Sequence, residues 1–472
     1  MSRKKELAKN TFIISIGTIC TKLITFLLLP LYTGILNTDE YGIVDLFNTL
    51  IFLLLPIITF QIEQAVFREL IEHRKDEEKK KTIISSSIIT IIFQCICFVL
   101  LFIPISFFIN NQYKKLLLLN IVVHVFSSIF LQISRGLGDN KKYAIGSFIS
   151  ALFTIIFNIV FLVLCDLRVS GMLLGTILGQ TICCLYLFVF LKLYRFIGIE
   201  YFDKKMVKSL LKYSIPLIPN AICWWIFQSS DRAIVSGILG LSMTGILAAA
   251  SKFSGIYTTM YNVFDRSWFE SITLHYHDSD IESYFNRTFN MMLKLFLGID
   301  IILISIMPFV YPIMINKKFS LGYVLVPILL ISCFFNVIQG MIAVIYAANK
   351  DTKSIAKTSS AAALINIIIH FALIKTTGLY AAALSTLGAF VIISVYRIFD
   401  IRKKYLKIVI DKEVTIIGLL SLLLILPLYY LNNMYLNLIS VLISLTICVI
   451  VNKEFLLDIK KNIKNIIKRR MI

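Results

Sequence analysis

The stretch TFIISIGTICTKLITFLLLPLYTGIL, residues 11–36, decides the fold class of this chain. It is longer than the roughly 20 apolar residues that an α-helix needs to cross a bilayer. Two further stretches of this kind run from Thr82 to Phe108 and from Phe285 to Tyr311. Each is too long and too apolar for an ordinary core helix, so all three predict transmembrane helices.

The composition of the whole chain agrees with a membrane location. Of its 472 residues, 58% are hydrophobic and 16% are charged, whereas charged residues make up about a quarter of soluble domains. We count fourteen apolar segments, which begin near residues 11, 43, 82, 116, 143, 170, 212, 242, 285, 323, 354, 378, 412 and 436. The first is too long for a signal peptide and lacks a small-residue cleavage site, so we expect it to be retained. The sequence therefore predicts an all-α polytopic membrane protein with about 14 transmembrane helices.

The net charge of +20 is explained by membrane topology rather than by nucleic-acid binding. When the N-terminus is taken as cytoplasmic, most of the 47 Lys and Arg residues fall in cytoplasmic segments, as the positive-inside rule predicts. An even number of spans places both termini on the same side. We therefore expect both termini in the cytoplasm and the chain in a bacterial cytoplasmic membrane.

Two weak internal repeats predict two lobes that run in the same direction. The tripeptide GIL at Gly34, followed by Gly42, recurs at Gly237, followed by Gly245, with an offset of 203 residues. A second set, Lys142, Asn158 and Gly171, matches Lys350, Asn366 and Gly378 at offsets of 207 or 208. Parallel repeats of this kind occur in transporters. The expected organisation is a cytoplasmic N-terminus (1–10), a six-helix N-lobe (11–195), a linker (196–211), a six-helix C-lobe (212–400), two C-terminal helices (401–452) and a basic cytoplasmic tail (453–472).

The linker and the tail both show amphipathic spacing. In the linker, apolar residues such as Met206 and Leu210 alternate with lysines such as Lys204 and Lys208 at helical intervals. Such a segment is expected to lie flat on the inner membrane surface. For the tail, contact with anionic lipid and simple cytoplasmic retention charge are equally consistent with the sequence.

Four of the predicted spans carry a polar stripe, which lipid cannot satisfy. In the first span, polar residues recur at intervals of four and three, which places them on one helix face. The four stripes consist of Thr11, Ser15, Thr18, Lys22 and Thr25; Asp45, Thr49, Pro56, Thr59 and Glu63; Asn220, Trp224, Gln228 and Asp231; and Lys252, Gly255, Thr259, Asn262 and Arg266. We expect them to converge on one water-filled cavity between the lobes.

Three cations at this predicted cavity, Lys22, Arg232 and Lys252, suit an anionic ligand. A charged side chain at the bilayer centre costs roughly 2.5 to 3.5 kcal/mol on insertion scales, so it is expected to have a function or a partner. Arginine in particular can bind phosphate oxygens through two parallel hydrogen bonds. The alternative is that each cation pairs with an acid such as Asp45 or Asp231 and holds helices together.

Other ionisable residues have weaker patterns. Glu63 and Arg68 lie near the cytoplasmic end of the second span, where an entrance role and a local ion pair compete evenly. His275 and His277 lie in a polar loop without the further ligands that a metal site needs, and Asp300 belongs to no stripe. The chain contains no phosphate-binding Gly loop followed by Lys and Ser or Thr, so we expect no ATP site and no cofactor.

The order of several motifs resembles the oligosaccharide flippases of the polysaccharide transporter family. That family belongs to a superfamily with multidrug and toxin extruders and the peptidoglycan precursor flippase. The resemblance covers essentially the whole chain, with two departures: Leu247 stands where many relatives have Tyr, and no Pro follows Trp268 two residues on. The motifs are Pro30, NTDEYG at 37–42, Arg68, and the run Pro216, Pro219, Asp231, Arg232, Gly237 and Leu239, with Gly245, Ala250 and Lys252.

The resemblance implies a transporter rather than an enzyme. It implies two six-helix bundles around a cationic cavity, a side groove for a polyprenyl tail at the last two spans, and alternating access between the two sides. By position, Lys22, Arg232 and Lys252 would hold the pyrophosphate of a lipid-linked oligosaccharide. Membrane lipids and polysaccharide polymerase or assembly proteins are the partners that it suggests. The alternatives are a multidrug or peptidoglycan-precursor exporter of the same fold and, less favoured, a membrane glycan polymerase or acyltransferase.

Overall fold

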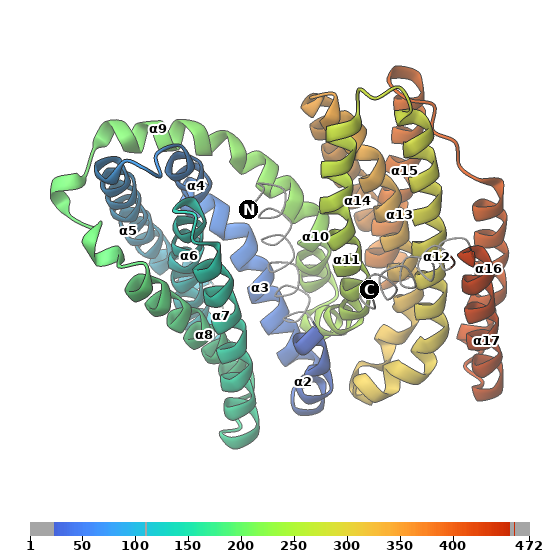
Figure 1. Ribbon diagram of the computed structural model, residues 1–472. Coiled ribbons are helices and arrows are strands. Elements are labelled where there is room, and N and C mark those ends of the chain that lie inside the picture. Colours follow the sequence, from blue (N-terminus) through green and yellow to red (C-terminus); the bar gives the residue numbers. More distant parts are fainter. Residues whose placement is uncertain (1–22, 109–110, 454–456, 458–472) are drawn as a thin grey trace, which may run out of the picture. The chain divides into compact units, whose positions relative to one another are not determined.

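The computed structural model describes residues 23–108, 111–453 and 457, and every regular element in these ranges is helical (Figure 1). Lys22 and most of the predicted basic tail lie outside the described residues. The helices are α2 (Leu29–Ile35), α3 (Thr38–Thr59), α4 (Ile62–Glu72), α5 (Glu77–Phe108), α6 (Lys114–Gly136), α7 (Asn140–Ile159), α8 (Arg168–Phe190), α9 (Lys204–Ser214), α10 (Ile218–Ile238), α11 (Leu241–His275), α12 (Ile281–Met314), α13 (Val326–Ala348), α14 (Thr352–Thr377), α15 (Tyr380–Lys404), α16 (Lys412–Leu431) and α17 (Met434–Val451). Five short helices connect them: η1 (Val160–Leu164), η2 (Leu193–Arg195), η3 (Ile199–Tyr201), η4 (Ile215–Leu217) and η5 (Lys317–Leu325).

The predicted fold class is confirmed. Within the described residues, twelve helical segments are long and apolar enough to cross a membrane. The described end of the first predicted span appears as a shorter apolar helix, Leu23–Ile35. The predicted eighth span corresponds to α11, a helix of 35 residues whose polar stripe keeps it outside the twelve.

The structure differs from the prediction at the second span, where two helices stand in place of one. Helix α3 ends at Thr59 and α4 begins at Ile62. Between them, Phe60 and Gln61 adopt φ values of 50° and 57°, in the left-handed region that ends an α-helix. The stripe predicted from Asp45 through Glu63 therefore does not continue on one helix face.

The chain forms two compact units, residues 1–245 and 246–472. In the first unit, α7 and α8 pack along each other, α6 packs against α4 and α8, and α3 contacts α6 and α10. Helix α9 runs across the end of this unit where α4 and α5 meet, and it contacts both (Figure 1). This division differs from the predicted lobe boundary at residue 212, and the arrangement in two six-helix lobes stays a prediction.

In the second unit, α13, α14 and α15 form one group, and α16 and α17 pack together against α12 (Figure 1). Tyr323 on η5 and Tyr429 on α16 join these two helices. Their rings stack with centroids 4.3 Å apart, and the Tyr429 hydroxyl donates to the Tyr323 carbonyl at 2.6 Å. The Tyr323 hydroxyl donates in return to the Tyr429 carbonyl at 3.2 Å.

Helix α9 has the two faces that the linker sequence predicts. Its lysines, including Lys204 and Lys208, are exposed, while Leu210 is fully buried and Met206 is half-buried. The apolar face of α9 therefore packs at least partly on the protein, so the linker does not offer this whole face to lipid.

One turn occurs twice in the fold, once before α7 and once before α14. In each, an Asp carboxylate accepts a hydrogen bond from the backbone N–H three residues on, at 3.1 Å for Asp139 and 3.0 Å for Asp351. The preceding residue has a positive φ in both turns, 87° at Gly138 and 57° at Lys350. The offset is 212 residues, so Gly138 and not Lys142 is the counterpart of Lys350. The predicted register of this second repeat was wrong.

In the first repeat, the glycine that follows GIL is a point of close helix contact in both copies. A Cβ atom added to Gly42 would lie 2.1 Å from the Leu241 carbonyl oxygen, and one added to Gly245 would lie 2.0 Å from the Thr38 carbonyl oxygen. These two contacts are reciprocal at the same offset of 203 residues. The Thr38 and Ser242 hydroxyls share a 2.7 Å hydrogen bond beside them. The two turns therefore face each other with local two-fold symmetry.

We predict that Gly42→Ala and Gly245→Ala each destabilise the protein by roughly 1 to 3 kcal/mol, because the added methyl group would overlap backbone oxygen rather than a movable side chain. Gly237→Ala is the matched control, since no atom lies within 4 Å of its ideal Cβ position. It should raise stability by about 0.5 to 1 kcal/mol, the usual gain of Ala over Gly in a helix. Thermal unfolding of the detergent-purified variants measures both effects. Equal stability of all three would contradict the close contact.

Candidate functional site

An ion pair joins α3 and α10 in the first unit. Arg232 Nε lies 2.6 Å from Asp45 Oδ2, and the two side chains keep 20% and 14% exposure. Arg232 Nη1 also donates to the Gln228 carbonyl at 3.0 Å. The alternative that the sequence left open for Arg232, pairing with Asp45, is thus present in the structure. The guanidinium still retains N–H groups beyond these two contacts, because arginine carries five.

The rest of the predicted stripe on α3 lies inside the protein. Thr49, Pro56 and Thr59 are buried. The Thr49 carbonyl accepts a 2.8 Å hydrogen bond from the indole N–H of Trp225 on α10. These residues are therefore buried within the first unit, where Thr49 contacts α10 and Thr59 contacts α5.

Helix α10 presents a polar face that is open. Asn220, Trp224 and Gln228 are exposed, with Trp224 at 53%, while Asp231 is half-buried. These residues recur every three or four positions, so they share one face of the helix. A face with an indole, two amides and a guanidinium at its end can contact both sugar hydroxyls and phosphate oxygens.

In the second unit, α11 has one polar face and one buried aromatic face. Gly255, Asn262 and Arg266 are exposed, and Lys252 is half-buried at the start of the same stripe. No atom lies within 4 Å of an ideal Cβ at Gly255. The opposite face is anchored by the buried aromatic residues Phe253, Tyr257, Tyr261 and Trp268. This packing holds the polar stripe of α11 outward.

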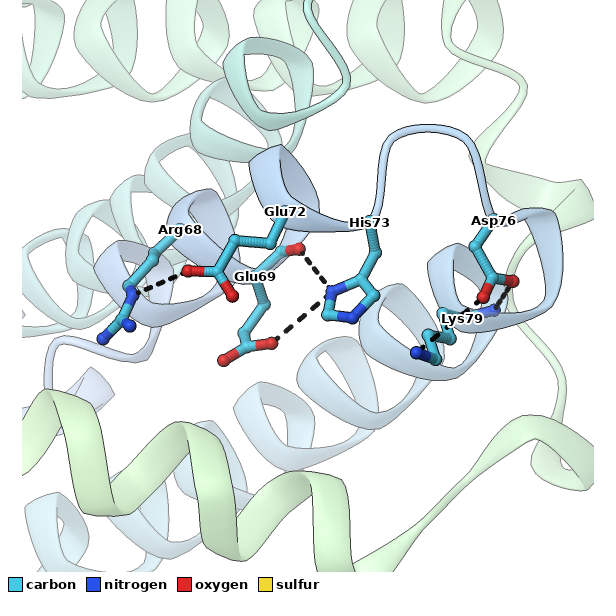
Figure 2. Close-up of polar contacts among 6 residues, drawn as sticks. All are labelled: Arg68, Glu69, Glu72, His73, Asp76 and Lys79. Atoms are coloured by element: carbon cyan, nitrogen blue, oxygen red, sulfur yellow. Dashed lines mark hydrogen bonds and ion pairs between the residues drawn. The ribbon is translucent and has the colours of Figure 1, made fainter.

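Glu63 and Arg68 lie on α4 and do not pair with each other. Arg68 Nε contacts Glu72 Oε1 at 3.2 Å, one helical turn further on (Figure 2), and its guanidinium carbon lies 4.6 Å from the centre of the Tyr213 ring on α9. Glu63 is 4% exposed. Its burial raises the pKa of the Glu63 carboxyl, an effect that its own N–H and the Thr59 hydroxyl offset in part.

The structure also places His275 and Asp300, for which the sequence predicted no role. His275 is the last residue of α11, and its Nδ1 lies 2.7 Å from Oδ2 of Asp278 in the exposed loop that follows. Asp300 is 1% exposed on α12. In the described part of the chain, no group of three or more His, Cys, Asp or Glu side chains could hold a metal ion together.

The sequence analysis missed a buried arginine on α15. Arg397 is 2% exposed, and its guanidinium donates to Thr358 at 2.8 Å, to Ser359 at 3.1 Å, and to the side chain and carbonyl of Gln339. These partners come from α13 and α14 and are all neutral. Arg397 stands near the basic end of its helix, so its sequence context could not distinguish it from an exposed topogenic charge.

The fold, with twelve long apolar helical segments in the described residues, defines a multi-pass, all-helical membrane protein. The sequence pattern described as polysaccharide biosynthesis protein matches residues 7–269, more than half of the chain. The chain therefore belongs to this family. Among curated proteins, no sequence matches it significantly.

Solved structures of two kinds share the fold. The lipid II flippase MurJ in an inward closed conformation aligns with a TM-score of 0.72 and 20% identity, over 95% of this chain and 99% of the flippase. An inward-facing multidrug resistance MATE family transporter of the MOP superfamily aligns with a TM-score of 0.65 and 11% identity, over 82% of this chain and 99% of that chain. At these identities the likeness establishes the fold alone.

A double-mutant cycle tests the contact between Asp45 and Arg232. We predict that Asp45→Asn and Arg232→Gln each lower the free energy of unfolding by about 1 to 3 kcal/mol, less than for a fully buried pair because both side chains retain some exposure. The double variant should recover part of this loss, since no charge is then left alone. Strictly additive losses in thermal unfolding would show that the two charges do not interact.

Proposed function

We propose that the protein is a flippase that moves a polyprenyl-pyrophosphate-linked oligosaccharide from the inner to the outer leaflet. The substrate class would be a repeat unit of a capsule, an exopolysaccharide or an O-antigen-type glycan. The observation that carries this proposal is the pair of open polar faces on α10 and α11, each with a basic residue, in a member of the polysaccharide biosynthesis protein family.

The chemistry of the substrate explains why cations are needed. A pyrophosphate brings at least two negative charges, and their transfer into a region of low dielectric is costly without opposite charge. Arg232 and Lys252, with Lys22 from the first span, would compensate this charge. Asp45 would keep Arg232 oriented while the site is empty, and phosphate oxygens would bind the remaining guanidinium N–H groups.

The neutral part of the substrate would meet other surfaces. Asn220, Gln228 and Asn262 offer amide groups for sugar hydroxyls, and Trp224 offers an exposed ring. The lipid tail would stay in the hydrocarbon beside α16 and α17, in a side groove that the family resemblance suggests. Transport would proceed by alternating access in a bacterial cytoplasmic membrane, without an enzymatic step, and with polysaccharide polymerase or assembly proteins as downstream partners.

A second candidate is export of a peptidoglycan precursor, which is also lipid-linked through phosphates. The fold shared with a lipid II flippase favours it, and the fold shared with a MATE transporter favours a multidrug exporter in the same way. A flippase-deficient strain for each substrate class distinguishes them, because the protein should restore one kind of export and not the others.

We predict that Lys22→Ala, Arg232→Ala and Lys252→Ala each abolish glycan export or reduce it at least tenfold, while the protein remains in the membrane at normal abundance. The reason is that each variant removes a compensating charge for the pyrophosphate. Complementation of a flippase-null strain, with protein abundance measured alongside, gives the result. Lys208→Ala, which removes an exposed charge from α9, is the matched control and should export normally.

Two outcomes would argue against the cationic site. Normal export by all three variants would remove the mechanism. Loss of protein in parallel with loss of export would favour a role in holding helices together, and Asp45→Asn separates these cases for Arg232. If Arg232 binds substrate, Asp45→Asn should retain export; if the ion pair is only structural, both single variants should fail alike.

The proposed direction of transport requires a cytoplasmic linker and cytoplasmic termini. We predict that a cysteine introduced as Lys204→Cys, on the exposed face of α9, reacts with a membrane-impermeant thiol reagent only after the cells are opened. The same reagent should reach Asp166→Cys, in the turn before α8, in intact cells. The chain's own cysteines are replaced first, and a reversed labelling pattern would overturn the topology.

A further inference from the structure

The junction of α3 and α4 contains a strained break in the first unit. Phe60 and Gln61 are consecutive residues in the left-handed region, where a residue other than glycine costs of order 1 to 3 kcal/mol. Such a break leaves the last carbonyl groups of α3 without helical donors, and these groups form the negative end of the helix dipole. The Thr59 carbonyl accepts instead from Gln94 Nε2 on α5, at 3.4 Å.

Glu63 places a buried carboxyl group beside this break. Helix α4 contains three glutamates, and two of them have a basic partner four residues away: Glu69 Oε2 lies 3.7 Å from His73, and Glu72 is paired with Arg68 (Figure 2). The residue four positions after Glu63 is Phe67. Within the described ranges, no hydrogen bond reaches Glu63 Oε2.

Gln94 also has a buried side-chain oxygen without a hydrogen-bond donor in the described ranges. Its side chain is 9% exposed, its amide N–H is used by the Thr59 carbonyl, and its Oε1 has no hydrogen-bond donor among the described residues. Glu63 and Gln94 therefore both approach Thr59, and each has a buried oxygen atom left over. Buried acceptors normally have partners, so a cation bound by the carboxylate form of Glu63 would satisfy both leftover oxygens.

The donor set limits which cation fits. A carboxylate, an amide carbonyl and a backbone carbonyl are hard oxygen ligands, which suit alkali and alkaline-earth ions rather than zinc or copper. A single carboxylate balances a single charge. Transporters also place ion sites at broken helices, where unwound carbonyl groups and helix C-terminal ends coordinate the ion.

We propose that the α3–α4 junction binds one Na⁺ ion, with Glu63 Oε2, Gln94 Oε1 and the main-chain carbonyl of Thr59 among its ligands. The site lies entirely within the first unit. The site is independent of which substrate is transported.

The test uses the purified full-length protein without substrate. Thermal unfolding is followed in NaCl and in choline chloride at equal ionic strength. Wild type should show a saturable rise in Tm of about 2 to 4 °C with Na⁺, because an ion that binds the folded state stabilises it by mass action. Glu63→Gln should abolish this rise. Gln94→Leu, which changes no charge, should increase the Na⁺ concentration for half of the effect at least tenfold.

Glu69→Gln is the matched control, since it makes the same change on the same helix at a carboxylate that already has a partner. It should keep the full response to Na⁺. An equal Tm in both salts, or an undiminished response in Glu63→Gln and Gln94→Leu, would overturn the site. A Tm that follows pH and ignores Na⁺ would assign the charge to a proton and would also overturn it. If Glu63→Gln cannot be purified, Gln94→Leu and wild type decide the question. Because the assay contains no glycan, its result is separate from that of the export assay.

Discussion

The hydrocarbon of a bilayer offers no hydrogen-bond partners, and this constraint governs the arrangement of polar groups in the protein. Arg397 shows the consequence most clearly. Its buried guanidinium donates hydrogen bonds to neutral oxygens of α13 and α14. One charged group on α15 therefore links three helices of the second unit. In the first unit, Asp45 and Arg232 meet the same constraint by pairing directly. Exposed polar residues on α10 and α11 would violate the constraint if they faced lipid, which is why we propose that they face water.

The contact between Gly42 and Gly245 allows one of these pairs to form. Backbone oxygen lies where a side chain would otherwise stand, so the start of α3 can approach the start of α11. Asp45 lies one turn beyond Gly42 and faces Arg232 on the neighbouring α10. The Trp225 hydrogen bond to Thr49 continues the same interface one turn further. Small residues at a helix contact thus determine where a charged pair can sit.

Several features could be predicted because they depend on local sequence. In the described residues the predicted apolar segments correspond to helices, the second of them to the pair α3 and α4, and the faces of α9 follow the spacing of its lysines. The break after Thr59 could not be predicted in this way, because Phe60 and Gln61 are not residues that favour a left-handed conformation. The register of the second repeat failed for a related reason. Similar residues in Gly-rich and Lys-rich turns can be aligned at several offsets. The equivalent hydrogen bonds of Asp139 and Asp351, in contrast, define a single offset.

The sequence by itself determined that this chain is an all-helical membrane protein and which helix faces are polar, because these depend on composition and on the period of the helix. It also pointed to Arg232 and Lys252 as unusual charges. The tertiary structure decided which partners the charges have. Arg232 meets Asp45 from a helix far away in the chain, Arg68 meets Glu72 on its own helix, and Glu63 meets no base among the described residues. Such pairings depend on which helices lie side by side and at what depth, and no local pattern in the sequence records that.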